Sequence, residues 1–247
     1  MKREKWKNSS FVSLVAVFAA FSIICDSFTG PPLPFSGVWY SWIFIAEPIN
    51  GIILGPYAGF LSSLIGVMVG HSIYLRGYSY TEFLFTFGAP IGAMISGLIF
   101  RGKWKIALVY YSALLGVFFI TPVSWELPFW GMWDVYLAFA CLLFLIIVIR
   151  KQKGLWDTRL SDINLLYVTA LSTFIGLEAD VLFRIFLFIP CQTYRIFFAL
   201  DTGTLQVIWA VGAVETSTKA ALSILVNMIV IPPLVKTVRK MRLKLLS

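Results

Sequence analysis

The sequence predicts an all-α fold, a polytopic transmembrane helical bundle of about eight spans in a single domain over residues 1–247. Two observations predict it. Hydrophobic residues make up 59% of the chain and charged residues only 13%, with a mean hydropathy of +0.86. That is more apolar surface than a soluble domain can bury. The apolar residues also fall into runs bounded by charges, Gly or Pro, so the lipid bilayer is the expected surrounding.

The apolar runs give the expected spans in chain order. A helix needs roughly 20 residues to cross a bilayer, because each residue adds about 1.5 Å. The runs lie at Phe11–Phe28, Val38–Leu54, Ala58–Leu75, Glu82–Phe100, Trp104–Pro122, Asp134–Ile149, Ile163–Ile189 and Leu205–Val235. The second run is interrupted by Pro48 and Asn50, and a Gly55-Pro56 turn separates it from the third.

Basic residues distinguish the two sides of this bundle. Lys and Arg concentrate in the cytoplasmic connections of membrane proteins, and 16 of the 20 here lie in alternate connections. They are Lys2, Arg3, Lys5, Lys7, Arg101, Lys103, Lys105, Arg150, Lys151, Lys153, Arg159, Lys236, Arg239, Lys240, Arg242 and Lys244. Both termini are therefore predicted to be cytoplasmic, with residues 1–10 and 236–247 as basic ends and the plasma membrane as the location.

Charge and cysteine content limit the function classes. The net charge of +8 is explained by this topology and by anionic lipid, so no nucleic-acid partner is expected. Cys25, Cys141 and Cys191 lack metal-ligand spacing and form no obvious pair. We interpret them as buried small apolar side chains, and the sequence predicts neither a metal nor a cofactor.

Polar side chains within the apolar runs are the candidates for a binding site. An ionisable group in hydrocarbon costs several kcal/mol unless it is paired or hydrated. Glu47 lies near the middle of the second span without a partner in that span, and Asn50 follows one turn later. His71 lies in the outer third of the third span, at a depth comparable to Asp26 in the first.

The seventh and eighth spans each carry two opposite charges four residues apart, either as structural pairs or as ligand groups. Nearly all these groups fall in the outer half of the bundle, which predicts an outward-facing cavity for a small polar or zwitterionic solute. The expected substrate-binding residues are Glu47, Asn50, His71, Glu178, Asp180, Arg184, Glu215 and Lys219. No catalytic residue is predicted.

Small residues recur at four-residue spacing, which allows helix backbones to approach closely. The rows are Ala16 and Ala20 in the first span, Gly66 and Gly70 in the third, and Gly88, Gly92 and Ser96 in the fourth. We interpret the rows of the third and fourth spans as internal packing.

Four segments together resemble a known family. They are Ala16-x-x-x-Ala20, the hairpin from Gly51 to Gly66 with Gly55-Pro56-x-x-Gly59, the segment from Gly88 to Arg101, and the last span from Glu215 to Leu222. They are similar to the S components, the substrate-binding membrane subunits of energy-coupling factor (ECF) vitamin transporters. Members of that family usually have six helices, so the region from about Trp125 to Leu200 would be an additional pair.

The resemblance implies a subunit that captures a vitamin-like small molecule and is not itself an enzyme. Transport would require a transmembrane coupling subunit and two cytoplasmic ATPases. Ala16 and Ala20 would contact the coupling subunit, and the polar outer end of the last span would face the solute.

Two other function classes remain open from the residues alone. One is a secondary transporter that uses Glu47 as its proton-coupling carboxylate. The other is an intramembrane cysteine transpeptidase of the archaeosortase type, with Cys191 near Arg195, or Cys141 with Arg184, as the nucleophile candidates.

Overall fold

The computed structural model describes residues 8–30, 40–73, 80–151 and 162–244. Within these ranges the regular secondary structure is helical apart from one antiparallel pair of two-residue strands, β1 (Thr29–Gly30) and β2 (Tyr40–Ser41). The α-helices are α1 (Asn8–Ser27), α2 (Ile43–Leu54), α3 (Pro56–Ile73), α4 (Tyr80–Phe85), α5 (Gly88–Phe100), α6 (Trp104–Ile120), α7 (Trp133–Lys151), α8 (Asp162–Phe188), α9 (Thr193–Ile196) and α10 (Thr202–Lys244). The all-helical prediction is confirmed for the described residues.

Two departures from the predicted runs change the layout of the helices. The fourth apolar run is divided into α4 and α5, because the chain turns at Thr86 and Phe87 before Gly88. The last helix continues through Pro232 and Pro233 to Lys244, beyond the expected end at Val235. The basic segment from residue 236 therefore begins as a continuation of the helix.

Four helical stretches in the described part are long and apolar enough to cross a membrane. They are Pro56–Ile73, Phe83–Phe100, Phe129–Arg150 and Thr202–Val238. The apolar stretches Phe11–Ser27, Ile43–Leu54 and Trp104–Ile120 are shorter than that length. Eight spans were expected from the sequence, and four of them reach a spanning length and composition.

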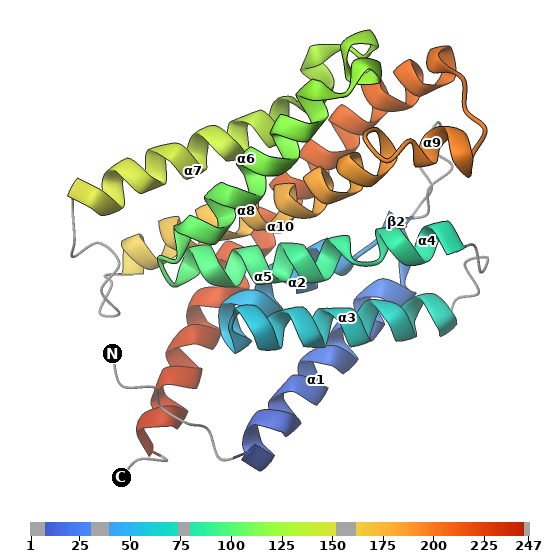
Figure 1. Ribbon diagram of the computed structural model, residues 1–247. Coiled ribbons are helices and arrows are strands. Elements are labelled where there is room, and N and C mark those ends of the chain that lie inside the picture. The colour runs from blue at the N-terminus through green and yellow to red at the C-terminus, as the bar shows by residue number, and fades with distance from the viewer. Residues whose placement is uncertain (1–7, 31–39, 74–79, 152–161, 245–247) are drawn as a thin grey trace.

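Successive long helices run in alternating directions between two ends of the molecule. Figure 1 shows the start of α1, the turn between α5 and α6, the end of α7 and the end of α10 on the left and lower side of the view. The opposite side holds α4, α9 and the connection between α6 and α7. The described chain thus begins and ends on the same side.

Helix α8 lies at the centre of the bundle. It packs against α2, α5, α6, α7 and α10, and its residues from Ile175 to Asp180 are all buried. Protein therefore surrounds the segment that carries the charged residues Glu178 and Asp180. This explains how a helix with several ionisable groups can form the core of an otherwise apolar bundle.

Helix α2 is short, and polar side chains satisfy both of its ends. Twelve residues span only about 18 Å, so its free backbone groups lie within the thickness of the bundle. At the start, the Ile43 N–H donates to the Ser41 hydroxyl over 3.2 Å. At the end, the Arg101 guanidinium donates to the carbonyl oxygens of Gly51 and Ile52 over 3.1 and 3.2 Å.

The Arg101→Ala substitution is expected to lower the stability of the bundle by about 2–3 kcal/mol, because it removes charged hydrogen bonds to the ends of α2 and α5. The measurement is the thermal unfolding of the purified protein in detergent. Lys103→Ala is the matched control, since Lys103 is an exposed cation two residues along. Equal melting temperatures of the two variants would contradict this role of Arg101.

Glycines allow the inner helices to touch through their backbones. A Cβ built on Gly51 would lie 1.8 Å from the Ala93 carbonyl oxygen of α5, and one on Gly59 would lie 2.6 Å from the Gly51 Cα. The predicted rows on α3 and α5 face inward as well: Gly66 faces Ser22 of α1, and Gly88 faces Asp180 of α8. Their interpretation as internal packing is confirmed.

The connection between α6 and α7 covers the end of the bundle opposite the start of α1 and the end of α10 (Figure 1). It contains two 3-10 helices, η1 (Pro122–Glu126) and η2 (Phe129–Met132). Trp209 of α10 donates from its indole to the Pro128 carbonyl over 3.0 Å and stacks on Phe118 at a centroid distance of 5.8 Å. These contacts hold the start of α10 against α6 and η2.

Candidate binding site

Glu47 is a buried carboxylate at the point where α2, α5 and α8 meet. Its exposed fraction is 0%, and within the described residues neither carboxylate oxygen has a hydrogen-bond partner. A Cβ on Gly92 would lie 2.6 Å from Glu47 Oε1 and 2.9 Å from the Gly176 carbonyl oxygen. The two glycines therefore make room for the carboxylate between α5 and α8.

Asp180 and Arg184 form an ion pair on α8 beside this point. The Arg184 Nε and Nη2 atoms donate to the two carboxylate oxygens of Asp180 over 2.6 and 3.1 Å. A Cβ on Gly88 would lie 1.8 Å from Asp180 Oδ1, so this pair also occupies space left by a glycine of α5. The Arg184 side chain is 41% exposed and that of Asp180 11%, which leaves the pair accessible from outside the core.

The contact between α5 and α8, which we call the seam, carries hydroxyl groups one turn from the two glycines that accommodate Glu47. Ser96 Oγ lies 1.7 Å from the position of a Cβ on Gly176, and Thr173 is on α8 one turn before Gly176. Both side chains are buried, and neither hydroxyl has a hydrogen-bond partner in the described ranges. The seam is therefore polar without being fully hydrogen-bonded, unlike an ordinary packed core.

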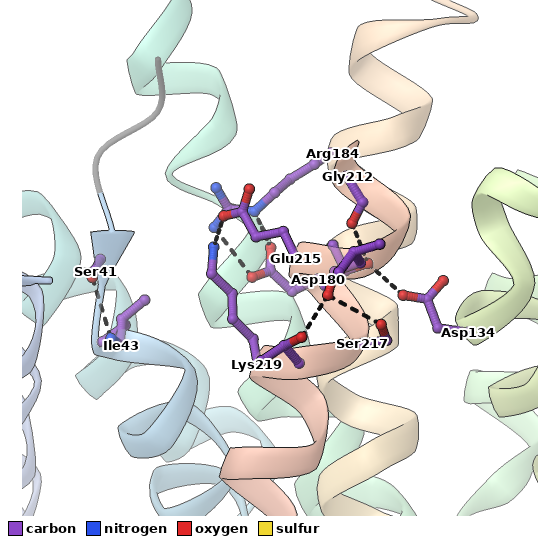
Figure 2. A network of polar contacts seen from close by, with 12 residues as sticks. Ser41, Ile43, Asp134, Asp180, Arg184, Gly212, Glu215, Ser217 and Lys219 are labelled. Carbon is purple, nitrogen blue, oxygen red and sulfur yellow. Dashed lines mark hydrogen bonds and ion pairs between the residues drawn. The ribbon is translucent and has the colours of Figure 1, made fainter. Parts of the chain in front are cut away.

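Glu215 and Lys219 form a second ion pair one turn apart on α10. Figure 2 shows this pair and the Asp180–Arg184 pair in one close view, on the adjacent helices α10 and α8. Further along α10, the Ser223 hydroxyl donates to the Phe44 carbonyl of α2 over 2.7 Å. The charged part of α10 is thereby fixed against the helix that carries Glu47.

Glu178 points to another side of α8. Two residues turn an α-helix by about 200°, so Glu178 lies almost opposite Asp180. It is fully buried and adjoins the large apolar cluster that includes Ile175 and Leu182. Both of its carboxylate oxygens lack a hydrogen-bond partner among the residues described, and Asp134 of α7 is within electrostatic reach.

Asn50 belongs to a different polar cluster, between α1, α2 and α3. Its amide nitrogen donates to the hydroxyl oxygens of Ser22 and Ser63 over 2.7 and 2.8 Å. The side chain thus joins three helices. The structure does not bring Asn50 into the group around Glu47, although the two residues are only three positions apart.

Replacing Asn50 with Ala should reduce stability by about 2 kcal/mol, because two buried hydroxyls lose a hydrogen-bond donor. Solute affinity should change less than twofold. Thermal unfolding and calorimetric titration of the same preparation measure the two quantities. A large loss of affinity at unchanged melting temperature would show that Asn50 contacts the solute instead.

His71 also lies in this three-helix cluster. Its Nδ1 is 2.6 Å from Asp26 Oδ2, and the Ser41 hydroxyl donates to Asp26 Oδ1 over 2.6 Å. Asp26 is fully buried, whereas the His71 side chain is 26% exposed. The carboxylate of Asp26 therefore links α1 to α3 and to the start of α2.

Some polar residues that contact or adjoin the candidate residues come from positions that sequence reasoning did not select. Asp26 contacts His71 and accepts a hydrogen bond from Ser41. Asp134, which is within electrostatic reach of Glu178, accepts a hydrogen bond from the Thr216 hydroxyl of α10. The similar depth of Asp26 and His71 was the available signal for the first contact. Asp134 stood at the expected start of a span, where a charge is unremarkable, so its interior contact gave no signal.

The cysteine prediction is wrong at one position. Cys25 and Cys141 are half-buried, whereas Cys191 is exposed in the turn after α8.

A cavity of about 600 Å³ lies at the connection from α9 to α10. Its lining residues are Tyr194, Arg195, Ala199, Leu200, Asp201 and Thr202. At this connection, hydrogen bonds from Thr204 lower the pKa of Asp201.

One sequence spacing imitates a phosphate-binding loop. Gly97 and Gly102-Lys103 are spaced as in that motif, but Trp104 stands where the motif requires Ser or Thr. Gly97 also lies inside α5, where a Cβ would be 2.4 Å from the Gly51 carbonyl oxygen. The glycine therefore serves helix packing here.

Comparisons with protein families, with curated proteins and with solved structures give no match to this chain. The fold therefore defines only a broad structural class of protein. Over the residues that the structure describes, the protein is helical with four stretches long and apolar enough to cross a membrane, and its interior carries several ionisable side chains.

Proposed function

We propose that the chain is the substrate-capture subunit of an ECF-type vitamin or micronutrient importer and binds a small polar solute in an outward-facing cavity. Glu47 is the observation that carries the proposal. It is a buried carboxylate, without a hydrogen-bond partner in the described part of the chain, beside the accessible Asp180–Arg184 pair. Such a group is costly in an apolar bundle, and function is the reason to retain it.

The proposal includes eight membrane crossings with both termini in the cytoplasm. Its support is the alternating direction of the long helices, with the start of α1 and the end of α10 on one side (Figure 1). Arg101 and Lys103, in the turn between α5 and α6, and Arg150, near the end of α7, lie on that same side. Basic residues favour the cytoplasmic face, so this end would face the cytoplasm of a cell whose plasma membrane holds the protein.

Helix α1 offers the surface for the proposed coupling subunit. Ala16 and Ala20 are exposed, because α1 packs against α3 through its opposite face, where Ser22 meets Gly66. Small exposed residues four positions apart permit close contact with another membrane helix. The chain would supply no chemistry, and two cytoplasmic ATPases would drive transport through the coupling subunit.

Ala16→Leu is expected to leave solute binding unchanged and to abolish assembly with the coupling subunit, because the larger side chain separates the helix backbones. Affinity purification of the tagged variant from membranes that contain the partners measures assembly. Val17→Leu is the control, since Val17 is already a large exposed side chain on α1. Assembly of the Ala16→Leu variant at the wild-type level would refute this contact.

Native mass spectrometry tests the capture function itself. Protein purified in mild detergent from cells grown in rich medium should carry one small molecule per chain. Extraction and accurate mass would then identify it. A protein that retains no small molecule, and whose melting temperature does not respond to the low-molecular-mass components of that medium, would contradict the proposal.

The same observation on Glu47 favours a second candidate, a proton-coupled secondary transporter. A buried carboxylate without a partner can also hold a proton that it exchanges during transport. Proteoliposomes that contain only this chain separate the two functions. Uptake driven by a proton gradient would support the secondary transporter and overturn the capture subunit.

A further inference from the structure

The structure assigns a charge to the solute: we propose that it carries a positively charged nitrogen group that pairs with the Glu47 carboxylate. This inference rests on the proposed capture function and narrows its substrate class to organic cations, including zwitterions with such a group. It follows from the distribution of charge and hydrogen-bond partners around Glu47.

Carboxylates outnumber basic groups in the interior of the described bundle. The buried acidic residues are Asp26, Glu47, Asp134, Glu178, Asp180 and Glu215. Arg101 is bound to backbone carbonyl oxygens at the ends of α2 and α5. The basic side chains next to the buried carboxylates are those of Arg184 and Lys219, together with His71. Each of the three already contacts a carboxylate: Asp180, Glu215 and Asp26 respectively. A solute carboxylate or phosphate would have to compete with those pairs.

Glu47 differs from most of the other buried acidic groups in the described bundle. Asp26 and Asp134 accept hydrogen bonds from Ser41 and Thr216, and Asp180 has its arginine. Glu47 has no such partner in the ranges that the structure describes. A buried ionised carboxylate requires a cation or several hydrogen-bond donors in direct contact. Arg184 is within electrostatic reach of Glu47 but donates its hydrogen bonds to Asp180, so a solute with a cationic N–H group would supply the hydrogen bonds that Glu47 lacks.

The surroundings of Glu47 present acceptors. The backbone carbonyl oxygen of Gly176 lies 2.9 Å, and Glu47 Oε1 2.6 Å, from the same point beside Gly92. The Ser96 hydroxyl lies on the same seam. Carbonyl and carboxylate oxygens both accept hydrogen bonds, so these oxygens match the N–H donors of an ammonium or amidinium group and repel an anion.

Glu178 lacks hydrogen bonds as well, but its position does not suit a solute. It adjoins apolar side chains on the other face of α8 and has Asp134 within electrostatic reach. Arg184 is within electrostatic reach of Glu47, and its side chain is 41% exposed. A solute could therefore approach Glu47 from the surface along Arg184. Of the two buried carboxylates that lack hydrogen-bond partners among the described residues, Glu47 is the one next to a side chain that reaches the surface.

The probe for a test is the low-molecular-mass filtrate of yeast extract, divided by ion exchange into cationic, anionic and neutral fractions. Each fraction is added to the full-length protein in detergent, and the melting temperature is recorded. The cationic fraction should raise the melting temperature of the wild-type protein, and the other two should not. Glu47→Gln should lose this rise, with solute affinity at least about tenfold weaker.

Asp134→Asn is the matched control, because it removes a buried carboxylate whose hydrogen bonds are supplied by Thr216 and the Val135 N–H. It should retain the rise. A rise caused by the anionic or neutral fraction, or retained in Glu47→Gln, overturns the cationic solute but leaves the capture function standing. No rise with any fraction overturns the capture function, and with it this inference.

Discussion

The Gly51→Ala variant is expected to lose the native bundle, with a destabilisation above the roughly 1–3 kcal/mol that overpacking usually costs. The reason is that the new Cβ would lie 1.8 Å from the Ala93 carbonyl oxygen and 2.7 Å from its carbon. Both are backbone atoms of α5, so no side-chain rotation relieves the overlap. Thermal unfolding and size-exclusion chromatography in detergent measure the effect.

Gly116→Ala provides the control for that experiment. Gly116 also lies within a helix, α6, but a Cβ there has no atom within 4 Å of those described. The free energy of unfolding of the Gly116→Ala protein should stay the same or rise by up to about 1 kcal/mol, because Ala has a higher helix propensity than Gly. A Gly51→Ala protein that melts with the wild type would show that α2 and α5 do not cross at Gly51.

The second large effect is expected for Glu47→Gln. The amide keeps the size of the side chain but removes its charge, so the solute should bind more weakly by about 1–3 kcal/mol. Calorimetric titration with the solute identified by mass spectrometry measures this difference. Because the carboxylate makes no hydrogen bond within the described bundle, the melting temperature without solute should not fall.

The outcome at Glu47 also distinguishes a binding role from a structural one. Unaltered affinity would show that Glu47 serves the fold. A lower melting temperature with unchanged affinity would lead to the same conclusion. Reduced affinity at an unchanged melting temperature is the combination that the proposed site requires.

Hydrophobic runs were sufficient to place the helices, because apolar residues in this chain are separated by clear Gly, Pro and charge boundaries. The expected run Ile163–Ile189 differs by one residue at each end from α8, Asp162–Phe188. The division at Thr86 and Phe87 was not predictable from hydropathy. It occurs within an apolar stretch, directly before the glycine that contacts the ion pair of α8.

The candidate site was predictable only in part. The i, i+4 spacing indicated that Asp180 can pair with Arg184 and Glu215 with Lys219, and both contacts are present, since helical geometry alone brings such residues together. Contacts between helices depend on how each helix is rotated, which periodicity does not specify in an almost uniformly apolar chain. For that reason the clusters around Asn50 and His71 could not be separated from Glu47 beforehand.

The surroundings of Glu47 also depend on contacts between helices that the sequence pattern does not specify. Its lack of a partner within α2 was visible in the sequence, but the glycines that accommodate it come from α5 and α8. Gly92 was interpreted as packing, and Gly176 was not selected. The relevant signal was the combination of small residues on two different helices, which only their contact reveals.

Affinity purification of the tagged chain from native membranes tests the central claim most directly. The capture-subunit account predicts that a transmembrane coupling subunit and two cytoplasmic ATPases co-purify with the wild-type chain and are absent from the Ala16→Leu preparation. Purification without ATPases, from membranes in which the chain alone supports solute uptake driven by a proton gradient, would contradict the account.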